Sequence, residues 1–362
     1  MPSILLIDDT AEELEGLAAA LRSLVLPTEA LVITWQPSKQ DEKEPVELLE
    51  DFLRPESAHD VRFVVTDYDL TRKGALGLYG STVVDQCQLR AIPVGDYSRG
   101  NASRLPKEPN LFEIRIPTKD YETAASFIAN VFRGFQHIRE TVKDLNPMPR
   151  SPAAGIAAIL DRPMDQNRFS QYGTRYPLVN SGLVDRTAPT GSGGQREAML
   201  KLFAYVTGHV LINLVLRYPG PIISREGLAA HCGISEVAVD QIESMFEACK
   251  YAGPFEGVDH YFWMDGVQSV LESLEPGDVD DTRTIGELNR AALEKHLNID
   301  LPRHSCSRCD GRNGGFYCPF TKRAVCLQNN CSVGSNGWIP PGARLCRIEK
   351  DYFDDWSPLL GL

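Results

Sequence analysis

The chain has 362 residues, of which 43% are hydrophobic and 24% charged, and its formal net charge is -12. This length allows two or three domains, and the composition is that of a globular protein. Because there is no apolar run near the roughly 18 residues that a membrane helix needs, and no export signal at the start, we expect a cytoplasmic protein without membrane contact. The negative charge disfavours nucleic acid as a partner, since a phosphate backbone is bound through Lys and Arg.

Short aliphatic runs alternate with helical patterns over residues 1–145, which is typical of a parallel sheet with crossover helices. Five strands are expected, at Ile4–Ile7, Ala30–Thr34, Arg62–Thr66, Ala91–Val94 and Leu111–Ile116. Between them, apolar residues at steps of three and four predict two buried helix faces: Leu14, Leu17, Leu21 and Leu24, then Ile128, Val131, Phe135 and Ile138. The sequence therefore predicts an α/β domain with a doubly wound, five-stranded parallel sheet.

Polar side chains follow these strands where ligands gather in such sheets, at the carboxyl edge. Asp8 and Asp9 end the first strand, Asp67 the third, and Ser98 and Lys119 follow the fourth and fifth. The two leading aspartates suit Mg²⁺, Asp67 suits a nucleophile toward phosphorus, and Ser98 and Lys119 suit contacts to a phosphoryl group. Simpler roles are a capping box made by Thr10 and Glu13, a turn at Asp67 and a solvated Lys119.

This set resembles the receiver domains of two-component response regulators. The matching motifs are "LLIDD", then "VVTDYDL" with Asp67 as phosphoacceptor and the Asp69 carbonyl as a metal ligand, Ser98 five residues after Pro93, and Lys119. The resemblance implies a flavodoxin-like fold, Mg²⁺ held by Asp8, Asp9, Asp67 and Asp69, and phosphorylation by a histidine kinase. The chain differs from the family's usual pattern in having Asp120 after the lysine and Ile116 three residues before it.

A proline-rich stretch, "NPMPRSPAAG", opens a linker and irregular segment that we place at residues 146–195. After it, residues 196–217 form one long helical pattern. "SREGLAAHCGISEVAVDQIESMFEACKYAGPF" then resembles a helix-turn-helix, and "KYAGPFEGVDHYFWM" reads as a β-hairpin. Residues 196–285 are thus expected to be a mainly α, winged-helix-like domain.

The second helix of this motif carries acidic side chains where a DNA reader needs basic or amide groups. It has Glu236, Asp240, Glu243 and Glu247 against Lys250, with Gln241 as its main amide. We therefore favour a winged helix with a protein-interaction or structural role, and keep DNA binding as the alternative. Cys232 and Cys249 stand at apolar positions and are expected to be core residues.

Residues 286–362 form a cysteine-rich module. The net charge turns positive here: residues 301–362 carry 8 basic and 5 acidic residues and contain six of the nine cysteines. Cys306 and Cys309 form a C-x2-C pair, Cys326 and Cys331 a looser one, and the arrangement resembles a zinc ribbon with a structural Zn²⁺. Cys318 and Cys346 are alternate ligands, and His304 lies nearby.

Together these patterns predict a phosphoryl-accepting signalling protein rather than a turnover enzyme, with a second signalling or effector protein as its output partner. The architecture resembles receivers of bacterial conflict or anti-phage (antiviral) relays. One alternative is a DNA-binding transcriptional regulator, and another is an adaptor that is never phosphorylated. A hydrolase of the haloacid dehalogenase class is disfavoured, because its D-x-D follows the first strand, whereas Asp67 and Asp69 follow the third.

Overall fold

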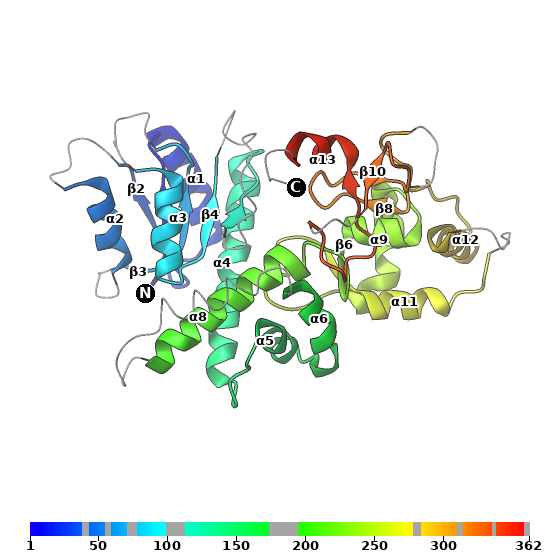
Figure 1. Ribbon diagram of the computed structural model, residues 1–362, viewed down its shortest axis with the longest axis horizontal. Coiled ribbons are helices and arrows are strands. Elements are labelled where there is room, and N and C mark those ends of the chain that lie inside the picture. The colour runs from blue at the N-terminus through cyan, green and yellow to red at the C-terminus, as the bar shows by residue number, and fades with distance from the viewer. Residues whose placement is uncertain are drawn as a thin grey trace. The chain divides into compact units, whose positions relative to one another are not determined.

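The structure, a computed structural model, describes residues 1–37, 43–54, 59–70, 78–98, 113–173, 195–277, 284–309, 314–334 and 338–357. The chain forms two compact units. The first contains residues 1–149 and 177–209, and the second contains residues 150–176 and 210–362. Figure 1 shows the elements of both units along the chain.

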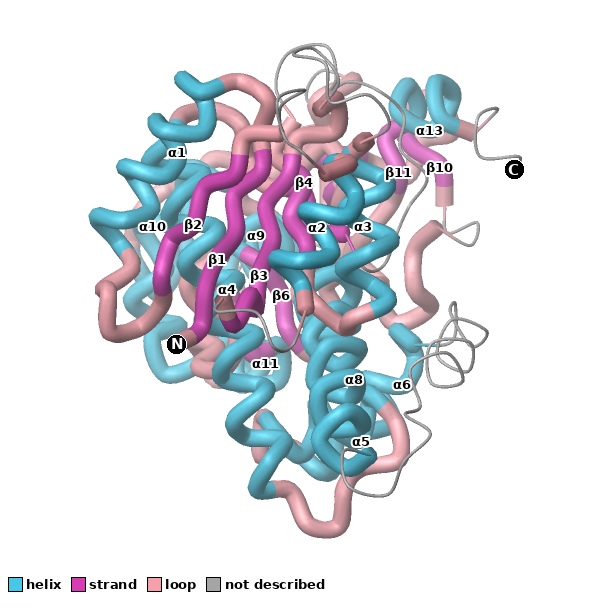
Figure 2. Tube along the Cα trace, turned by 90° about the vertical axis from the view of Figure 1, so that its left-hand side faces the viewer, coloured by secondary structure: helices cyan, strands magenta, loops and turns pink. Residues whose placement is uncertain are grey.

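A five-stranded parallel sheet forms the centre of the first unit, and four of its strands lie side by side in Figure 2. The strand order is β2-β1-β3-β4-β5, that of flavodoxin-like doubly wound sheets. This part of the predicted fold is confirmed. The strands are β1 (Pro2–Ile7), β2 (Leu31–Trp35), β3 (Asp60–Thr66), β4 (Val94–Asp96) and β5 (Glu113–Arg115).

Helices cover both faces of this sheet, which explains why "ILLI" is apolar without alternation. On one face α1 (Ala11–Leu24) packs against α4 (Tyr121–Asp144), and on the other α2 (Pro45–Leu53) packs against α3 (Gly80–Leu89). Leu5 and Ile7 of β1 join the α2–α3 core, and the alternation of side chains along a strand turns Ile4 and Leu6 to the opposite face.

The predicted helix faces are buried, with one exception. Ile128, Val131, Phe135 and Ile138 lie in the core of α4, as do Leu14, Leu17 and Leu21 of α1, but Leu24 is 42% exposed. Leu24 is the last residue of its helix, so the apolar face ends there and fewer residues cover its side chain.

The fourth strand begins later than predicted, at Val94 rather than Ala91. Ala91 has a φ of 48°, because the chain is still turning out of α3, and the amide of Ile92 donates to the carbonyl of Cys87. This shift places Asp96 inside the strand. Of the predicted fifth strand, Leu111 and Phe112 lie outside the described residues.

A long helix returns to the first unit from later in the sequence. It is α8 (Gln195–Val210), continued by a π-helical segment, η3 (Leu211–Val215), as the pattern over residues 196–217 predicted. Residues 196–215 are apolar and long enough to cross a membrane, so the expectation that no run approaches that length is wrong for this segment. However, 67% of the apolar window is buried inside the protein, as in a core helix, and this is weak evidence for a membrane span.

The second unit is mainly helical and carries short strands. It begins with α5 (Pro152–Ile159), η2 (Pro163–Asp165) and α6 (Gln166–Gly173). After η3, further helical segments alternate with two short strands. In order, these are β6 (Ile222–Ser224), α9 (Arg225–Cys232), η4 (Glu236–Ala238), α10 (Val239–Ile242), η5 (Glu243–Cys249), β7 (Tyr261–Trp263), α11 (Met264–Glu272) and α12 (Ile285–Leu297).

The turn glycine of the predicted helix-turn-helix ends α9. Gly233 has a φ of 66°, and a side chain there would lie 2.2 Å from the carbonyl oxygen of Gly286. Strand β7 pairs antiparallel with β6, and Lys250 bridges to Phe262 across the hairpin. Cys232 and Cys249 are core residues, as predicted.

The C-terminal segment is built from two-residue strands and one short helix. Strand β8 (Phe316–Tyr317) pairs with β9 (Ala324–Val325), and β10 (Ser332–Val333) pairs with β11 (Ile348–Glu349). Helix α13 (Lys350–Trp356) follows. Such short ladders cannot hold a fold by hydrogen bonding alone, so this segment needs another source of stability.

A buried histidine gives the first unit a testable pH dependence. His209 is fully buried against the rings of Phe135 and Tyr205, and burial lowers its pKa from 6.5 to about 3. Because the unfolded chain binds the proton first, stability is complete above about pH 6.5 and falls with acidification toward pH 3. We expect His209 to contribute about 2 kcal/mol to the loss of unfolding free energy between pH 7 and pH 5.

Urea unfolding at both pH values measures this loss, and His209→Leu should remove its share of about 2 kcal/mol. The control is His137→Gln, on an exposed position of α4, which should leave the pH dependence unchanged. An unaltered pH dependence in His209→Leu would show that the ring is already charged or exposed.

Candidate functional site

Three carboxylates meet at the carboxyl edge of the sheet. Asp8 and Asp9 follow β1 and Asp67 follows β3, and one oxygen from each lies within 4.8 Å of the others. Neighbouring parallel strands that end at the same level bring these groups together. Three like charges at this distance repel, so the cluster requires a proton or a cation.

The two leading aspartates are held differently. Asp8 accepts a hydrogen bond from the backbone amide of Thr10 at 2.6 Å. Asp9 is the more deeply buried of the two, with 1% of its surface exposed. Asp9 accepts the Thr10 hydroxyl at 3.1 Å through Oδ1, but its Oδ2 is buried and has no hydrogen-bond partner among the described residues. A buried carboxylate oxygen in that position is costly unless a ligand completes it.

The capping-box alternative is wrong. Thr10 is the residue before α1, but its side chain makes no capping hydrogen bond, because the hydroxyl donates to Asp9 instead. Glu13 accepts the Tyr121 hydroxyl at 3.1 Å, which ties α1 to α4. The capping box therefore does not explain the acidic pair.

Asp67 is partly buried. Its Oδ1 accepts the Tyr68 amide at 2.7 Å, and the same amide donates to the Ser98 hydroxyl at 3.0 Å. Burial raises the pKa of Asp67, and the charges of Asp96 and Asp9 act in the same direction against these hydrogen bonds. Burial likewise raises the pKa of Asp8 to about 6, helped by Asp67, Asp9 and Glu13.

A fourth carboxylate, Asp96, belongs to this group and was not among the predicted site residues. It is 6% exposed on β4, and its Oδ1 accepts the Ser98 hydroxyl at 2.5 Å. In "GDYS" the two residues stand two apart, so an extended chain turns both side chains to one side. That spacing could have indicated Asp96, but the strand was predicted to end before it.

The remaining residues of interest at this edge do not join the carboxylate group. Lys119 is exposed and forms no ion pair with any described residue, and Asp69 is partly buried. Asp120 begins α4 by accepting the Thr123 amide at 2.6 Å, which gives this departure from the receiver pattern a structural role. Ile116 is buried in the core.

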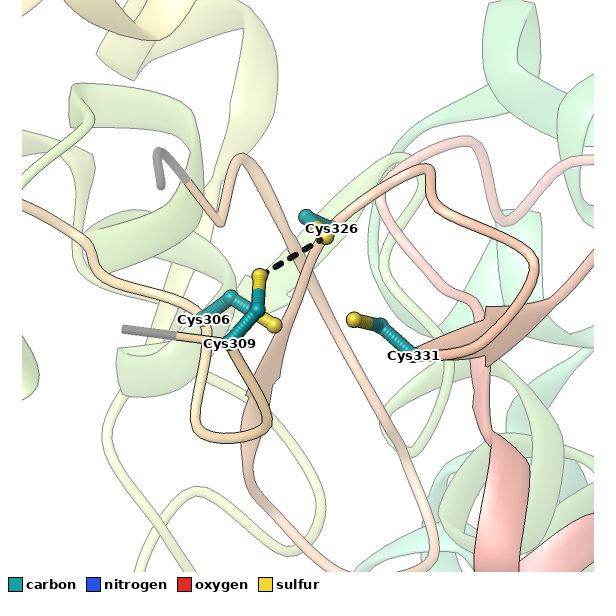
Figure 3. Close-up of side chains that lie close together, drawn as sticks. All are labelled: Cys306, Cys309, Cys326 and Cys331. Atoms are coloured by element: carbon teal, nitrogen blue, oxygen red, sulfur yellow. Dashed lines mark hydrogen bonds between the residues drawn. The ribbon is translucent and has the colours of Figure 1, made fainter. Parts of the chain in front are cut away.

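Four thiols form a second group in the C-terminal segment. The sulfurs of Cys306, Cys309, Cys326 and Cys331 lie within 4.8 Å of one another, and Figure 3 shows the four side chains pointing toward a common centre. The sulfurs of Cys309 and Cys326 are 3.6 Å apart. Such a four-thiol set can hold a metal ion.

Local hydrogen bonds prepare this group. Although burial acts against it, the backbone amides of Arg308 and Cys309 lower the pKa of Cys306 to about 7, which favours the thiolate. The Ser332 hydroxyl donates to the Cys326 carbonyl and accepts from Arg347, so the second loop is also braced.

The alternate ligands lie elsewhere. Cys318 and Cys346 are buried outside the four-thiol group, and burial raises the pKa of Cys346. His304 is 4% exposed, and its Nδ1 accepts the Gly315 amide at 2.9 Å. The structure therefore favours the two predicted cysteine pairs as the group able to bind metal.

Comparison with known proteins adds no family. No family model, no curated protein and no solved structure matches this chain.

A glycine packed against the Asp67 backbone offers a test of this geometry. Gly80 begins α3, and a Cβ there would lie 2.6 Å from the Asp67 carbonyl oxygen and 2.8 Å from the Tyr68 Cα. In an open helix Gly→Ala stabilises by about 1 kcal/mol. Here the backbone must move, so we expect Gly80→Ala to destabilise by about 2 kcal/mol in urea unfolding.

The matched control is Ser81→Ala, at the exposed neighbouring position of α3, which should change stability by less than about 0.5 kcal/mol. A Gly80→Ala variant as stable as the wild type would mean that α3 does not rest on the Asp67 backbone.

Proposed function

We propose that this chain is a phosphoryl-accepting signalling protein, phosphorylated on Asp67 by a histidine kinase. The observation that carries the proposal is the buried Asp9 Oδ2, which lacks a partner among the described residues and belongs to a carboxylate grouped with Asp8 and Asp67. The donor set fits Mg²⁺, which prefers carboxylates, carbonyls and water. Asp8, Asp9, Asp67 and the Asp69 carbonyl would hold it.

In the proposed reaction an Asp67 oxygen attacks the phosphorus of a phosphohistidine. A carboxylate O–P bond forms, the P–N bond breaks, and the leaving imidazole takes up a proton. Mg²⁺, when bound, supplies positive charge next to the transferring phosphoryl group. The Tyr68 amide holds the Asp67 carboxylate in place through its hydrogen bond of 2.7 Å. The chain would act as a switch or phosphate acceptor, not as a turnover enzyme.

Ser98 is suited to sense the new group. Its hydroxyl lies 3.0 Å from the Tyr68 amide and donates to Asp96, so a rotation would redirect its proton from Asp96 to a phosphoryl oxygen. Lys119 is exposed after β5 and would pair with the phosphoryl charge. These rearrangements would bias the surface around β5 and α4 toward another protein.

For the output we favour protein interaction through the winged-helix-like region over DNA binding. Its acidic second helix pairs with the nearby cations: Arg225 binds Asp240 at 2.8 Å, and Lys250 binds Glu247 at 2.7 Å. The basic residues of the C-terminal segment are engaged in the same way, in the pairs Arg308–Asp351, Lys322–Glu226 and Arg323–Glu349. These five cations are therefore already paired with carboxylates and are less available to a phosphate backbone.

The four-thiol group suits a structural Zn²⁺, because four thiolates give the closed tetrahedral set of structural zinc sites. Zinc would then act as the core of a segment whose strands have two residues each. We place the protein in the cytoplasm, where such thiols stay reduced, and infer a role in a bacterial relay, of which anti-phage defence is one setting.

Phosphorylation is tested by intact-protein mass spectrometry after incubation with acetyl phosphate and Mg²⁺. We expect the wild type to gain about 80 Da, the mass of one phosphoryl group on a carboxylate nucleophile, and Asp67→Asn to gain nothing. The control Asp85→Asn, on α3 and exposed, should be modified like the wild type. An unmodified, folded wild type would favour an adaptor that is never phosphorylated.

Zinc is tested by elemental analysis of protein purified under reducing conditions. We expect about one Zn²⁺ per chain, and nearly none in Cys306→Ser, since structural sites need all four ligands. Cys318→Ala should keep its zinc, because that thiol lies outside the group. If Cys318→Ala or Cys346→Ala lost the metal and Cys306→Ser kept it, the four-thiol ligand set would be wrong.

A further inference from the structure

The edge of the sheet opposite the carboxylates carries a cluster of cations around a cavity. Strand β3 begins at Asp60, with Arg62 near this edge, and ends at Thr66, just before Asp67 at the other. Arg62, Arg139 of α4 and Lys201 of α8 line a cavity of about 30 Å³ together with Gln136. All four residues belong to the first unit. We call this the cation pocket.

Of the three cations in the pocket, Arg62 is held by hydrogen bonds, whereas Arg139 and Lys201 are not. Arg62 donates through Nε and Nη2 to Asp60, at 2.9 and 2.6 Å, and through Nη1 to the Gln136 Oε1 at 2.8 Å. Each of its Nη atoms keeps a second N–H for another acceptor. Arg139 and Lys201 make no hydrogen bond or ion pair with any described residue, although both are partly buried.

The charges of the pocket do not balance. The three lining cations have one hydrogen-bonded carboxylate among them, Asp60. Glu140 and Glu197 act on Arg139 from solvent-exposed positions, where their charges are screened, and Arg90 adds a further positive charge near Lys201. Burial, together with the charges of Arg139, Arg62 and Arg90, lowers the pKa of Lys201 to about 8, against the effect of Asp60. Burial and Arg62 also lower the pKa of Arg139. Partly desolvated like charges of this kind are costly unless an anion joins them.

We propose that the cation pocket binds a phosphate group, either free inorganic phosphate or the terminal phosphate of a small metabolite. The guanidinium forks of Arg62 and Arg139 match phosphate oxygens, and the excess of cations among the lining residues suits an anion. The cavity has the volume of two to three waters, at roughly 10–15 Å³ of such volume for each, which suits the head group and not a whole nucleotide. This site is independent of the function proposed for Asp67.

The pocket is tested by calorimetric titration of the full chain with inorganic phosphate at pH 7, with ionic strength held by chloride and no divalent metal added. We expect one site per chain, weakened at least tenfold by Lys201→Gln and by Arg139→Gln. Lys201→Arg should keep the affinity within about threefold, since it keeps the charge. The matched control Lys143→Gln, an exposed cation one turn beyond Arg139 on α4, should change it less than twofold.

A second titration with glycerol 3-phosphate separates the two sources. Tighter binding of the ester indicates a phosphorylated metabolite, and tighter binding of inorganic phosphate indicates the free ion. In both cases Asp67→Asn should leave the affinity unchanged, because the carboxylate site lies at the other ends of the strands.

Sulfate, whose charge is constant with pH, tests the role of Lys201. As pH rises through about 8, Lys201 loses its proton, so the wild type should bind sulfate several-fold more weakly at pH 9.5 than at pH 7. Lys201→Arg should change less than twofold. The proposal is overturned if folded wild type binds neither phosphate, if Lys201→Gln and Arg139→Gln bind like the wild type, or if Asp67→Asn abolishes binding.

Discussion

Repulsion between carboxylates is the main constraint on the first unit, because acidic side chains meet at the carboxyl ends of its strands. The parallel sheet ends β1, β3 and β4 at one level, and each strand delivers an acidic side chain there. The surrounding hydrogen bonds satisfy part of the group: the Thr10 and Tyr68 amides hold Asp8 and Asp67, and the Ser98 hydroxyl holds Asp96. They leave a buried oxygen of Asp9 for which the described chain offers no donor. A core built only for stability has no reason to keep that arrangement.

The first unit also carries charges of opposite sign at the two ends of its strands. The carboxyl ends of the strands gather negative charge, and the amino ends, covered by α4 and α8, gather Arg62, Arg139 and Lys201. The cations at that edge come from segments more than sixty residues apart in the sequence. On the proposals made above, a bound cation would offset the charge at one edge and a bound anion the charge at the other.

The sequence allowed the strand-end aspartates, the sheet and the four thiols to be predicted, because each depends on local pattern. Alternation of aliphatic runs and helices indicates a parallel sheet, and the C-x2-C spacing of Cys306 and Cys309 indicates a knuckle. Asp96 was missed because Ala91 has a left-handed conformation that the composition of "AIPVGDYS" does not reveal, so the strand was placed three residues early. The cation pocket could not be predicted, since Lys201 reaches it only through the tertiary packing of α8.

The order of the C-terminal segment along the chain bears on how the protein is completed. Its four thiols come from residues 306 to 331, and its last strand, β11, pairs back onto β10 only after residue 349 has been synthesised. Lys322, between the two thiol pairs, binds Glu226 of α9 at 2.9 Å, so this segment supplies the ion-pair partner of a largely buried carboxylate in the helical region. If the four thiols hold zinc as proposed, newly made chains in a metal-starved cell would carry an open, protease-sensitive end, and the amount of functional protein would follow the supply of metal as much as the rate of synthesis.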